Sequence, residues 1–398
     1  MKKIILLGAT GSIGTQTLEI IEENKDLYEL ISVSIGHNVT GLMEILARFA
    51  TIKEVALLDE ASIPSLQAKY PQLRFYAQEA GILKLLDNET ADVVLNAIIG
   101  FAGLASSIKA IEHDKVLALA NKETMVVAGD IIRELLSQHP QAKILPVDSE
   151  HCALFQCLDK ANPKELSKLI ITASGGAFRD KTLSELSAVT IDDALRHPNW
   201  SMGAGITVDS ATMLNKGLEV IEAHHLFAVG YDDIEVVLHY ESIVHSMVEF
   251  KDSSIMAQLS LPNMKQPINY CLGYPERIAY NEAKIDFTKR LNLTFRPIDL
   301  ERFEGLALAL QAGRLAHSYP CVLNASKEEA TNAFLAGKIK FLDITKLVKQ
   351  ALAHNVKVEN PDLQDLYQID QKTRAYVLSI IDEPERYRGG AVKEKGEI

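Results

Sequence analysis

Two carboxylates close together follow a short apolar run near the middle of the chain. Residues 144–147 are apolar, Asp148 comes next, and Glu150 stands two positions later. In an extended backbone, side chains at i and i+2 point the same way, so the two acids would face one ligand. Paired carboxylate oxygens suit Mg²⁺ or Mn²⁺. Taken alone, the pair is better explained as a solvated turn in which Asp148 or Ser149 caps a helix.

A second polar group falls on one side of a predicted helix farther along the chain. Its members, spaced at helical intervals, are Asn215, Lys216, Glu219 and Glu222. Residues 208–212 predict the start of this helix, with Asp209 or Ser210 as its cap. An amide, an ammonium and two acids so arranged are most often a surface ion-pair patch, and that alternative stays open.

The elements that must position these groups begin with alternating strands and helices over residues 1–147. Short apolar runs predict strands at residues 4–7, 30–35, 55–58, 93–99, 116–119 and 143–147. A helical stretch, residues 15–27, follows the first of them. This alternation predicts a doubly wound parallel sheet, in which ligands bind beyond the carboxyl ends of the strands.

The turn after the first predicted strand is rich in glycine. Residues 8–14 read Gly-Ala-Thr-Gly-Ser-Ile-Gly between a strand and a helix. Glycines let the backbone approach a pyrophosphate, which a helix N-terminus attracts; the alternative is a tight turn without a ligand. After the second strand come Gly36, His37 and Asn38, with no carboxylate to repel a 2′-phosphate, which favours NADP over NAD.

Polar or glycine residues follow five of the predicted strands. The stretches are residues 8–14, 36–38, Gly100, 121–123 (Asn-Lys-Glu) and 148–150 (Asp-Ser-Glu). The carboxyl ends of parallel strands share one edge of the sheet, so we expect these stretches to converge there. Any one of them could be a plain turn, but their agreement predicts a ligand site.

Residues 148–275 predict a second α/β region. The strand at 169–173 runs into Ser174-Gly175-Gly176, a loop that could wrap an anion or be an ordinary turn. The loop at 197–203 holds the only tryptophan, Trp200, among turn residues, which predicts a hydrophobic lid. Further strands at 235–239, 244–250 and 255–259 predict an antiparallel sheet that could form a dimer interface.

The last part of the chain is predicted to be helical. Residues 275–297 indicate a mixed linker, and apolar side chains recur at helical spacing within residues 323–335, 344–352 and 376–381. These helices predict a small bundle. From Arg386 onward the chain is charged and contains glycine, which predicts a frayed end.

Composition sets limits on partners and compartment. The chain of 398 residues is long enough for two or three domains. Its net charge of −12 disfavours nonspecific nucleic-acid binding, and no apolar run approaches a membrane span. Four cysteines, at 152, 157, 271 and 321, show neither a CxxC pair nor zinc spacing, which indicates reduced thiols in a cytoplasmic protein.

Several of these motifs together resemble one enzyme family, the 1-deoxy-D-xylulose 5-phosphate reductoisomerases, over nearly the whole chain. The motifs are residues 8–14, 120–123, 147–151, 174–176, 196–203 and 208–219. The resemblance implies NADPH- and metal-dependent (Mg²⁺ or Mn²⁺) conversion of 1-deoxy-D-xylulose 5-phosphate to 2-C-methyl-D-erythritol 4-phosphate in the non-mevalonate route to isoprenoid precursors. It also implies a homodimer with an NADPH-binding Rossmann-like domain (1–147), a catalytic and dimerisation domain (148–275), a linker (276–300) and a helical domain (301–398).

The resemblance also assigns a role to each candidate residue. The metal ligands are Asp148, Glu150 and Glu219, and Lys122 joins them as catalytic. The substrate residues are Lys122, Ser149, Glu150, Ser174, His197, Trp200, Ser210, Asn215, Lys216 and Glu219, of which Ser174, Ser210, Asn215 and Lys216 hold the phosphate. The cofactor residues are Gly8, Thr10, Gly11, Ser12, Ile13, Gly36, His37, Asn38, Asn121, Glu123 and Gly203.

The implied chemistry begins with chelation of the substrate's ketone and hydroxyl oxygens by the metal, a Lewis acid. The carbon skeleton then rearranges by retro-aldol cleavage and re-addition, and NADPH reduces the resulting aldehyde. Two rival hypotheses remain. One is an NADP-dependent oxidoreductase without metal or rearrangement, which the three carboxylates disfavour. The other is a non-catalytic NADP-binding protein, which the complete set of site residues disfavours.

The chain departs from the family pattern in four places, none of them a metal ligand. His37 stands where lysine is common, and Ala204-Gly205 precedes Ile206 where a lysine is expected. His225 replaces a usual tryptophan. Residues 324–328 read Asn-Ala-Ser-Lys-Glu in place of Asn-Ala-Ala-Asn-Glu.

Overall fold

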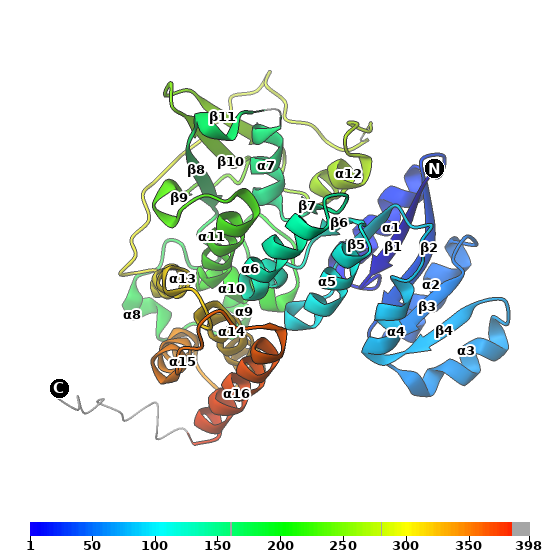
Figure 1. Ribbon diagram of the computed structural model, residues 1–398. Helices are drawn as coiled ribbons and strands as arrows, with labels where there is room; N and C mark the ends of the chain where they lie inside the picture. The colour runs from blue at the N-terminus through cyan, green and yellow to red at the C-terminus, as the bar shows by residue number, and fades with distance from the viewer. Residues whose placement is uncertain (160, 280, 384–398) are drawn as a thin grey trace. The chain divides into compact units, whose positions relative to one another are not determined.

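The computed structural model describes residues 1–159, 161–279 and 281–383, which form two compact units (Figure 1). The first unit comprises residues 1–174 and 222–297; the second comprises 175–221 and the described residues from 298 onward. Helix α11 (Leu214–Phe227) crosses from the second unit into the first. The finer division into four functional parts stays a prediction, and the expected fraying from Arg386 lies outside the described residues.

Seven parallel strands form the main sheet of the first unit, in the order β4-β3-β2-β1-β5-β6-β7. They are β1 (Lys2–Leu7), β2 (Tyr28–Ile35), β3 (Glu54–Leu57), β4 (Arg74–Ala77), β5 (Val93–Asn96), β6 (Val116–Leu119) and β7 (Lys143–Pro146). The intervening helices are α1 (Ser12–Glu23), α2 (Val39–Arg48), α3 (Ile63–Lys69), α4 (Gln78–Leu85), α5 (Leu104–Glu112) and α6 (Glu123–Gln138). The predicted doubly wound sheet is confirmed. Strand β4 was not predicted, because it is a short edge strand that buries none of its residues fully and so lacks an apolar run.

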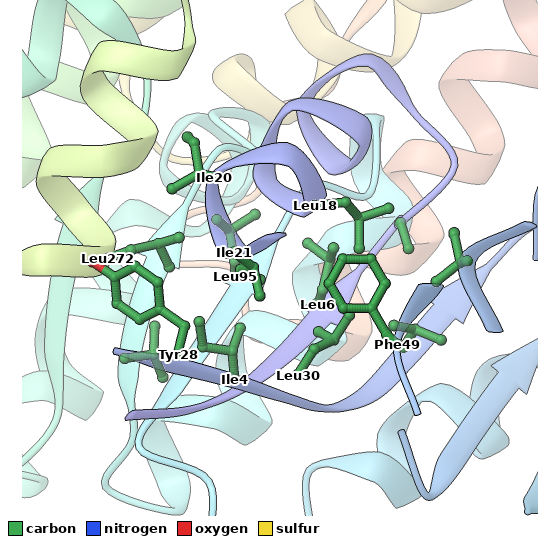
Figure 2. Packing of buried hydrophobic residues seen from close by; sticks show 14 of the residues in the cluster. Ile4, Leu6, Leu18, Ile20, Ile21, Tyr28, Leu30, Phe49, Leu95 and Leu272 are labelled. Atoms are coloured by element: carbon green, nitrogen blue, oxygen red, sulfur yellow. The ribbon is translucent and has the colours of Figure 1, made fainter. Parts of the chain in front are cut away.

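The core of this sheet explains the apolar runs in the sequence. Ile4 and Leu6 of β1 are fully buried, and in Figure 2 they point toward Leu18 and Ile21 of helix α1. A parallel sheet covered on both faces needs strands that are apolar on both sides, so β1 reads as a continuous apolar segment. Helix α12 (Lys265–Gly273) extends the same core through Leu272.

A second sheet in the first unit corrects one expectation. Its order is β11-β10-β8-β9, with β8 (Leu166–Ala173), β9 (Ile234–Leu238), β10 (Val244–Phe250) and β11 (Ile255–Leu259). The predicted β10–β11 hairpin is confirmed. The expectation of a wholly antiparallel sheet is wrong, because β9 pairs with β8 in parallel. The connection between them, residues 174–233, is long enough to cross over and return in the same direction.

The second unit is helical within the described residues. Its helices are α8 (Leu183–Leu186), α9 (Ile191–Ala194), α10 (Ala204–Ala211), α13 (Glu304–Leu315), α14 (Tyr319–Leu335), α15 (Phe341–His354) and α16 (Leu363–Asp382). Helix α14 packs against α10, α13, α15 and α16, so it is central to this unit (Figure 1). The predicted C-terminal helical region is confirmed.

The predicted helix start at residues 208–212 is wrong. Helix α10 begins earlier, at Ala204, and places Asp209 and Ser210 in its last turn. Met213, with a φ of +62°, then separates α10 from α11. Asp209 does not serve as a cap because its carboxylate is bonded to side chains of α14.

All four cysteines are free and buried, in agreement with the expectation of reduced thiols. Burial raises the pKa of Cys157 to about 11 and also raises the pKa of Cys271 and Cys321. No helix in the described ranges combines the length and apolar character needed to cross a membrane.

The packing of the main sheet predicts a large effect of truncating Leu95. This side chain is fully buried, so Leu95→Ala should lower the free energy of unfolding by about 2–5 kcal/mol through lost burial and a new cavity. The matched control is Leu27→Ala, because Leu27 is 41% exposed and its loss should cost under about 1 kcal/mol. Urea denaturation of both variants measures the difference. Equal losses would contradict the described core.

Candidate functional site

A crevice for a ligand is expected where the strand order reverses at β1. Strand β2 lies on one side of β1 and β5 on the other, so the loops after β1 and β5 diverge at the carboxyl edge of the sheet. Gly8, directly after β1, has a φ of +80°, and a Cβ there would lie 2.7 Å from the Ala97 carbonyl oxygen. A Cβ on Gly14 would lie 2.3 Å from the Gly8 carbonyl oxygen. Only glycine fits either position, so the glycine turn brings α1 close to the sheet edge.

The N-terminus of α1 lies at this carboxyl edge of the sheet, directly after the glycine turn. Its N-cap is Gly11, which has no side chain to bond the first helical amides. Such amides attract phosphate groups. The loop after β2 leaves His37 and Asn38 exposed, and Asn38 Oδ1 accepts a hydrogen bond from the Gly41 amide at 2.9 Å to cap α2. The predicted cofactor residues around α1 and β2 therefore follow adjacent strands at one edge.

Both polar atoms of the Asn121 side chain form hydrogen bonds within the protein. Its Nδ2 donates to the carbonyl oxygens of Ile98 (2.6 Å) and Gly100 (2.7 Å). Its Oδ1 accepts from the amide (2.9 Å) and the hydroxyl (2.6 Å) of Thr124. With every donor and acceptor bonded, this side chain anchors the loop after β5. A ligand contact from Asn121 would come from its backbone.

Asp148 is the N-cap of helix α7 (Ser149–Leu158). Its Oδ1 accepts from the Glu150 amide at 3.1 Å, so the predicted cap is confirmed. The expectation that Asp148 and Glu150 converge through an extended backbone is wrong, because the chain turns helical at Ser149. Even so, carboxylate oxygens of the two acids lie within 4.8 Å of one another, since both belong to the start of α7.

Two cationic or polar partners hold the Asp148 carboxylate. Lys122, which precedes α6, donates from Nζ to Oδ2 at 2.5 Å, and His151 Nδ1 lies 2.9 Å from Oδ1. Burial alone would raise the pKa of Asp148, but the charges and hydrogen bonds of Lys122 and His151 outweigh it and hold the pKa well below its ordinary value. The carboxylate is therefore ionised and able to bind a cation.

His151 had no predicted role of its own, yet it links two acids. Its Nδ1 also lies 3.2 Å from Oε2 of Glu222 on α11, and both side chains are fully buried. The imidazole thus lies between the two acids, and its hydrogen bond to Asp148 orients that carboxylate. The position of His151, three residues after the cap and therefore in the same helical turn, was the available signal.

Three members of the other predicted polar group, Asn215, Lys216 and Glu219, belong to the second unit, and Glu222 belongs to the first. Glu219 accepts from Asn215 Nδ2 at 2.5 Å and from Lys216 Nζ. Glu219 is 1% exposed and Lys216 6%, so the alternative of a surface ion-pair patch is wrong. A Cβ on Gly176 would lie 2.6 Å from the Ser210 carbonyl oxygen, so the loop at 175–176 closely approaches the backbone at Ser210.

His197 shapes the predicted lid loop. Its Nδ1 accepts hydrogen bonds from the amides of Asn199 (3.2 Å) and Trp200 (3.0 Å). Burial, helped by the nearby charge of Arg179, lowers the pKa of His197 to about 4. The imidazole is therefore neutral near pH 7 and carries its proton on Nε2. Trp200 is only half-buried, so it is not a core residue, and its role in a lid stays a prediction.

The predicted site residues thus divide between the two units. Lys122, Asp148, Ser149 and Glu150 belong to the first unit, with Ser174 and the cofactor residues other than Gly203. His197, Trp200, Gly203, Ser210, Asn215, Lys216 and Glu219 belong to the second.

Successive parts of the chain match models of the same enzyme family. Residues 4–129 match a model described as 1-deoxy-D-xylulose 5-phosphate reductoisomerase, and residues 144–227 and 259–376 match C-terminal domains of the same enzyme. The reductoisomerase of Geobacillus sp. is 48% identical over 383 residues, which cover 96% of this chain and 100% of the relative. That of Halalkalibacterium halodurans is 46% identical with the same coverage.

Solved structures with the same fold carry the same name. The reductoisomerase of Zymomonas mobilis in complex with NADPH superposes with a TM-score of 0.89 at 38% identity, covering 96% of this chain and 99% of that one. A DOX-P reductoisomerase in complex with NADPH, fosmidomycin and magnesium gives a TM-score of 0.91 at 36% identity, covering 97% and 100%.

The His197 contacts predict how the loop responds to acid. Because the folded pKa of His197 is about 4, below the ordinary 6.5, its contribution to stability is complete above pH 6.5 and is lost as the pH falls through 4. Trp200, the only tryptophan, reports on this loop. Its fluorescence should change with a midpoint near pH 4.

Two controls separate this loop change from global unfolding. Far-UV circular dichroism over the same pH range follows the helices, and His197→Gln removes the titrating group and should remove the fluorescence transition. A transition centred near pH 6.5, or one that persists in His197→Gln with unchanged circular dichroism, would contradict the assignment.

Proposed function

The chain belongs to the 1-deoxy-D-xylulose 5-phosphate reductoisomerase family, and we propose that the side chains described above perform the family's reaction in it. It converts 1-deoxy-D-xylulose 5-phosphate to 2-C-methyl-D-erythritol 4-phosphate, with NADPH and a divalent metal. The observation that carries the site proposal is the largely buried Asp148, which is held by Lys122 and His151 and lies beside Glu150 at the carboxyl edge of the sheet. The rival hypotheses of a metal-free oxidoreductase and a non-catalytic binder lack such support.

We assign NADPH to the crevice at β1. The open amides of α1 suit its pyrophosphate, and the loop at 36–38 offers His37 and Asn38 without a carboxylate near a 2′-phosphate. The glycine turn supports the fit, because Gly8 and Gly14 let the backbone pack closely and bring the N-terminus of α1 to the edge of the sheet. NADPH supplies the hydride when bound. The protein's own part is to hold the loop after β5 in place through Asn121.

We assign the divalent metal to Asp148, Glu150 and Glu219. Carboxylate oxygens are the donors that Mg²⁺ and Mn²⁺ prefer, and a low pKa keeps Asp148 ionised. When bound, the metal polarises the substrate's carbonyl oxygen. Lys122 and His151 each hold one oxygen of the Asp148 carboxylate, so it keeps one orientation, which a ligand must have.

We assign the substrate phosphate to Ser174, Ser210, Asn215 and Lys216, and the reacting end to Lys122 and Ser149. Neutral His197 can donate Nε2–H to the substrate while its Nδ1 orders the loop that carries Trp200. A loop closed over the substrate excludes water from the reacting atoms. The phosphate, held away from the reacting carbons, provides binding energy that orients them.

The function is tested by following NADPH absorbance after addition of 1-deoxy-D-xylulose 5-phosphate with Mn²⁺ or Mg²⁺, and again with EDTA. Oxidation should require both substrate and metal. Turnover that persists in EDTA would favour the metal-free oxidoreductase, and NADPH binding without oxidation would favour the non-catalytic protein. Glu219→Gln should lower turnover by more than about a hundredfold, because a ligand of the Lewis acid is lost, while NADPH affinity stays unchanged.

The matched control for Glu219→Gln is Glu235→Gln. Glu235 lies on β9, is about half exposed and, among the described residues, forms an ion pair with exposed Lys168, so its loss should leave turnover unchanged. Turnover of Glu219→Gln at the wild-type rate would overturn the metal assignment.

We further propose a cytoplasmic homodimer whose contacts lie in the 148–275 region. Strand β11 is an edge strand, and its Ile255 and Met256 are each 52% exposed. An exposed apolar edge is a surface that a second copy can cover. Four free, buried thiols suit a reducing compartment. The functional division into an NADPH-binding part (1–147), a catalytic and dimerisation part (148–275), a linker (276–300) and a helical part (301–398) belongs to the same proposal.

Sedimentation velocity tests the dimer. The wild type should sediment at about twice the chain mass of 43.9 kDa, and Met256→Asp should shift it toward the monomer because a buried charge opposes association. Leu378→Asp changes a comparably exposed residue on α16 and serves as the control, with no expected shift. A monomeric wild type, or a dimer unaffected by Met256→Asp, would contradict the interface.

A further inference from the structure

A buried ion pair in the second unit joins α10 to α14. Lys327 Nζ donates to Asp209 Oδ2 at 2.9 Å, and the Thr331 hydroxyl donates to Oδ1 at 2.8 Å. All three side chains are buried, with exposures between 3% and 6%. Lys327 and Thr331 are one turn apart on α14 and so present adjacent donors. Because both carboxylate oxygens are bonded, the Asp209 side chain has one fixed orientation.

The clamp formed by Asp209, Lys327 and Thr331 lies directly beside residues proposed to hold the phosphate. Asp209 precedes Ser210 in the last turn of α10, and the joint at Met213 then leads to Asn215 and Lys216 at the start of α11. The clamp therefore fixes the end of the helix from which the phosphate residues continue.

Two close backbone contacts also restrain the connection between α10 and α11. A Cβ on Gly176 would lie 2.6 Å from the Ser210 carbonyl oxygen, and a Cβ on Gly305 would lie 2.3 Å from the Thr212 carbonyl oxygen. These contacts restrict translation of the backbone. The clamp adds a directional restraint, since hydrogen bonds to a carboxylate depend on angle as well as distance.

The energetics indicate a role beyond stability. Removing two charges from water is costly, and apolar residues of similar volume often stabilise a protein as well as or better than a buried ion pair. Asp209 without a partner would also place a negative charge next to a bound phosphate, and like charges repel strongly where water is excluded. Lys327 cancels that charge.

We propose that Asp209 and Lys327 are positioning residues for the substrate phosphate. Lys327 neutralises Asp209, and the clamp holds Ser210 and the joint between α10 and α11 in the geometry that binds the phosphate. The inference rests on the proposed function, because it presupposes that Ser210, Asn215 and Lys216 contact a phosphate. Both residues act through these neighbours.

The test compares phosphate recognition with the other properties of the enzyme. Lys327→Met removes the cation beside the Asp209 carboxylate and leaves its hydrogen bond from the Thr331 hydroxyl. We expect KM for 1-deoxy-D-xylulose 5-phosphate and the inhibition constant of inorganic phosphate to rise roughly ten- to a hundredfold, the effect of losing a hydrogen bond to a charged group. The kcat at saturating substrate and the Kd of NADPH should stay within about threefold of the wild type.

A double variant distinguishes positioning from a purely structural role. Asp209→Asn combined with Lys327→Met removes both charges, while the amide oxygen introduced at position 209 can still accept from Thr331. The inhibition constant of inorganic phosphate should then return to within about threefold of the wild type. A purely structural pair would instead lower Tm and kcat with KM, and the double variant would not recover phosphate inhibition.

The matched control is Lys349→Met, which removes an exposed lysine paired with Glu304 in the same unit and should change none of these constants. If Lys327→Met does not fold, Thr331→Val provides the test. This variant keeps the charges of Asp209 and Lys327 and removes the hydrogen bond to Asp209 Oδ1. It should raise KM and the phosphate inhibition constant several-fold with little change in Tm. Unchanged constants in either variant would overturn the inference.

Wild-type turnover separates this inference from the proposed function. No NADPH oxidation by the wild type would overturn the function itself. Wild-type oxidation together with a Lys327→Met enzyme that has unchanged KM and phosphate inhibition would overturn the clamp alone.

Discussion

The carboxylate of Asp148 is the constraint on which the arrangement of the first unit depends. Its side chain is only 10% exposed, and a carboxylate with so little water around it is stable only with partners that replace water. Those partners come from separate segments: Lys122 after β6, His151 in α7, and through His151 the Glu222 of α11. Satisfying one acid therefore ties the start of α6 to the start of α7.

Similar pairing recurs in the second unit. Glu219 is bonded to Lys216, and Asp209 to Lys327. Arg374 of α16 contacts three acids, Asp370 of its own helix and Glu328 and Glu329 of α14. In a chain with a net charge of −12, each of these buried or half-buried acids has a cation beside it, which offsets the cost of removing its charge from water. The contacts of Arg374 and Lys327 also join separate helices to α14 or α10.

Much of the fold was predictable because its pattern is local. A strand buried on both faces is apolar throughout, so β1, β2 and β5 were predicted, and the loops after them were placed at one edge by topology alone. Strand β4 was missed because an edge strand needs no apolar run. The parallel pairing of β8 with β9 depends on a crossover of about sixty residues, which no local pattern specifies.

The candidate site was also predictable in part: its motif residues could be identified from the sequence, but their contacts could not. Motif residues such as Asp148 and Lys122 were identified from their types and positions after strands. Their partners were not. The pairing of Asp209 with Lys327 joins positions 118 residues apart, and the internal bonding of Asn121 depends on a loop more than twenty residues away. Both are products of tertiary packing. The helix start at Ala204 was missed for the same reason, since Asp209 has the type of a cap but is bonded elsewhere.

The buried thiols of Cys152, Cys157, Cys271 and Cys321 have a practical consequence. Maleimide dyes and spin labels react with exposed thiolates, whereas all four thiols are buried, and burial also raises the pKa of Cys157, Cys271 and Cys321. A cysteine introduced on the surface would therefore be labelled selectively against the native background. Fluorescence or electron-spin measurements on the lid loop can thus be made in the full chain with its own cysteines left in place.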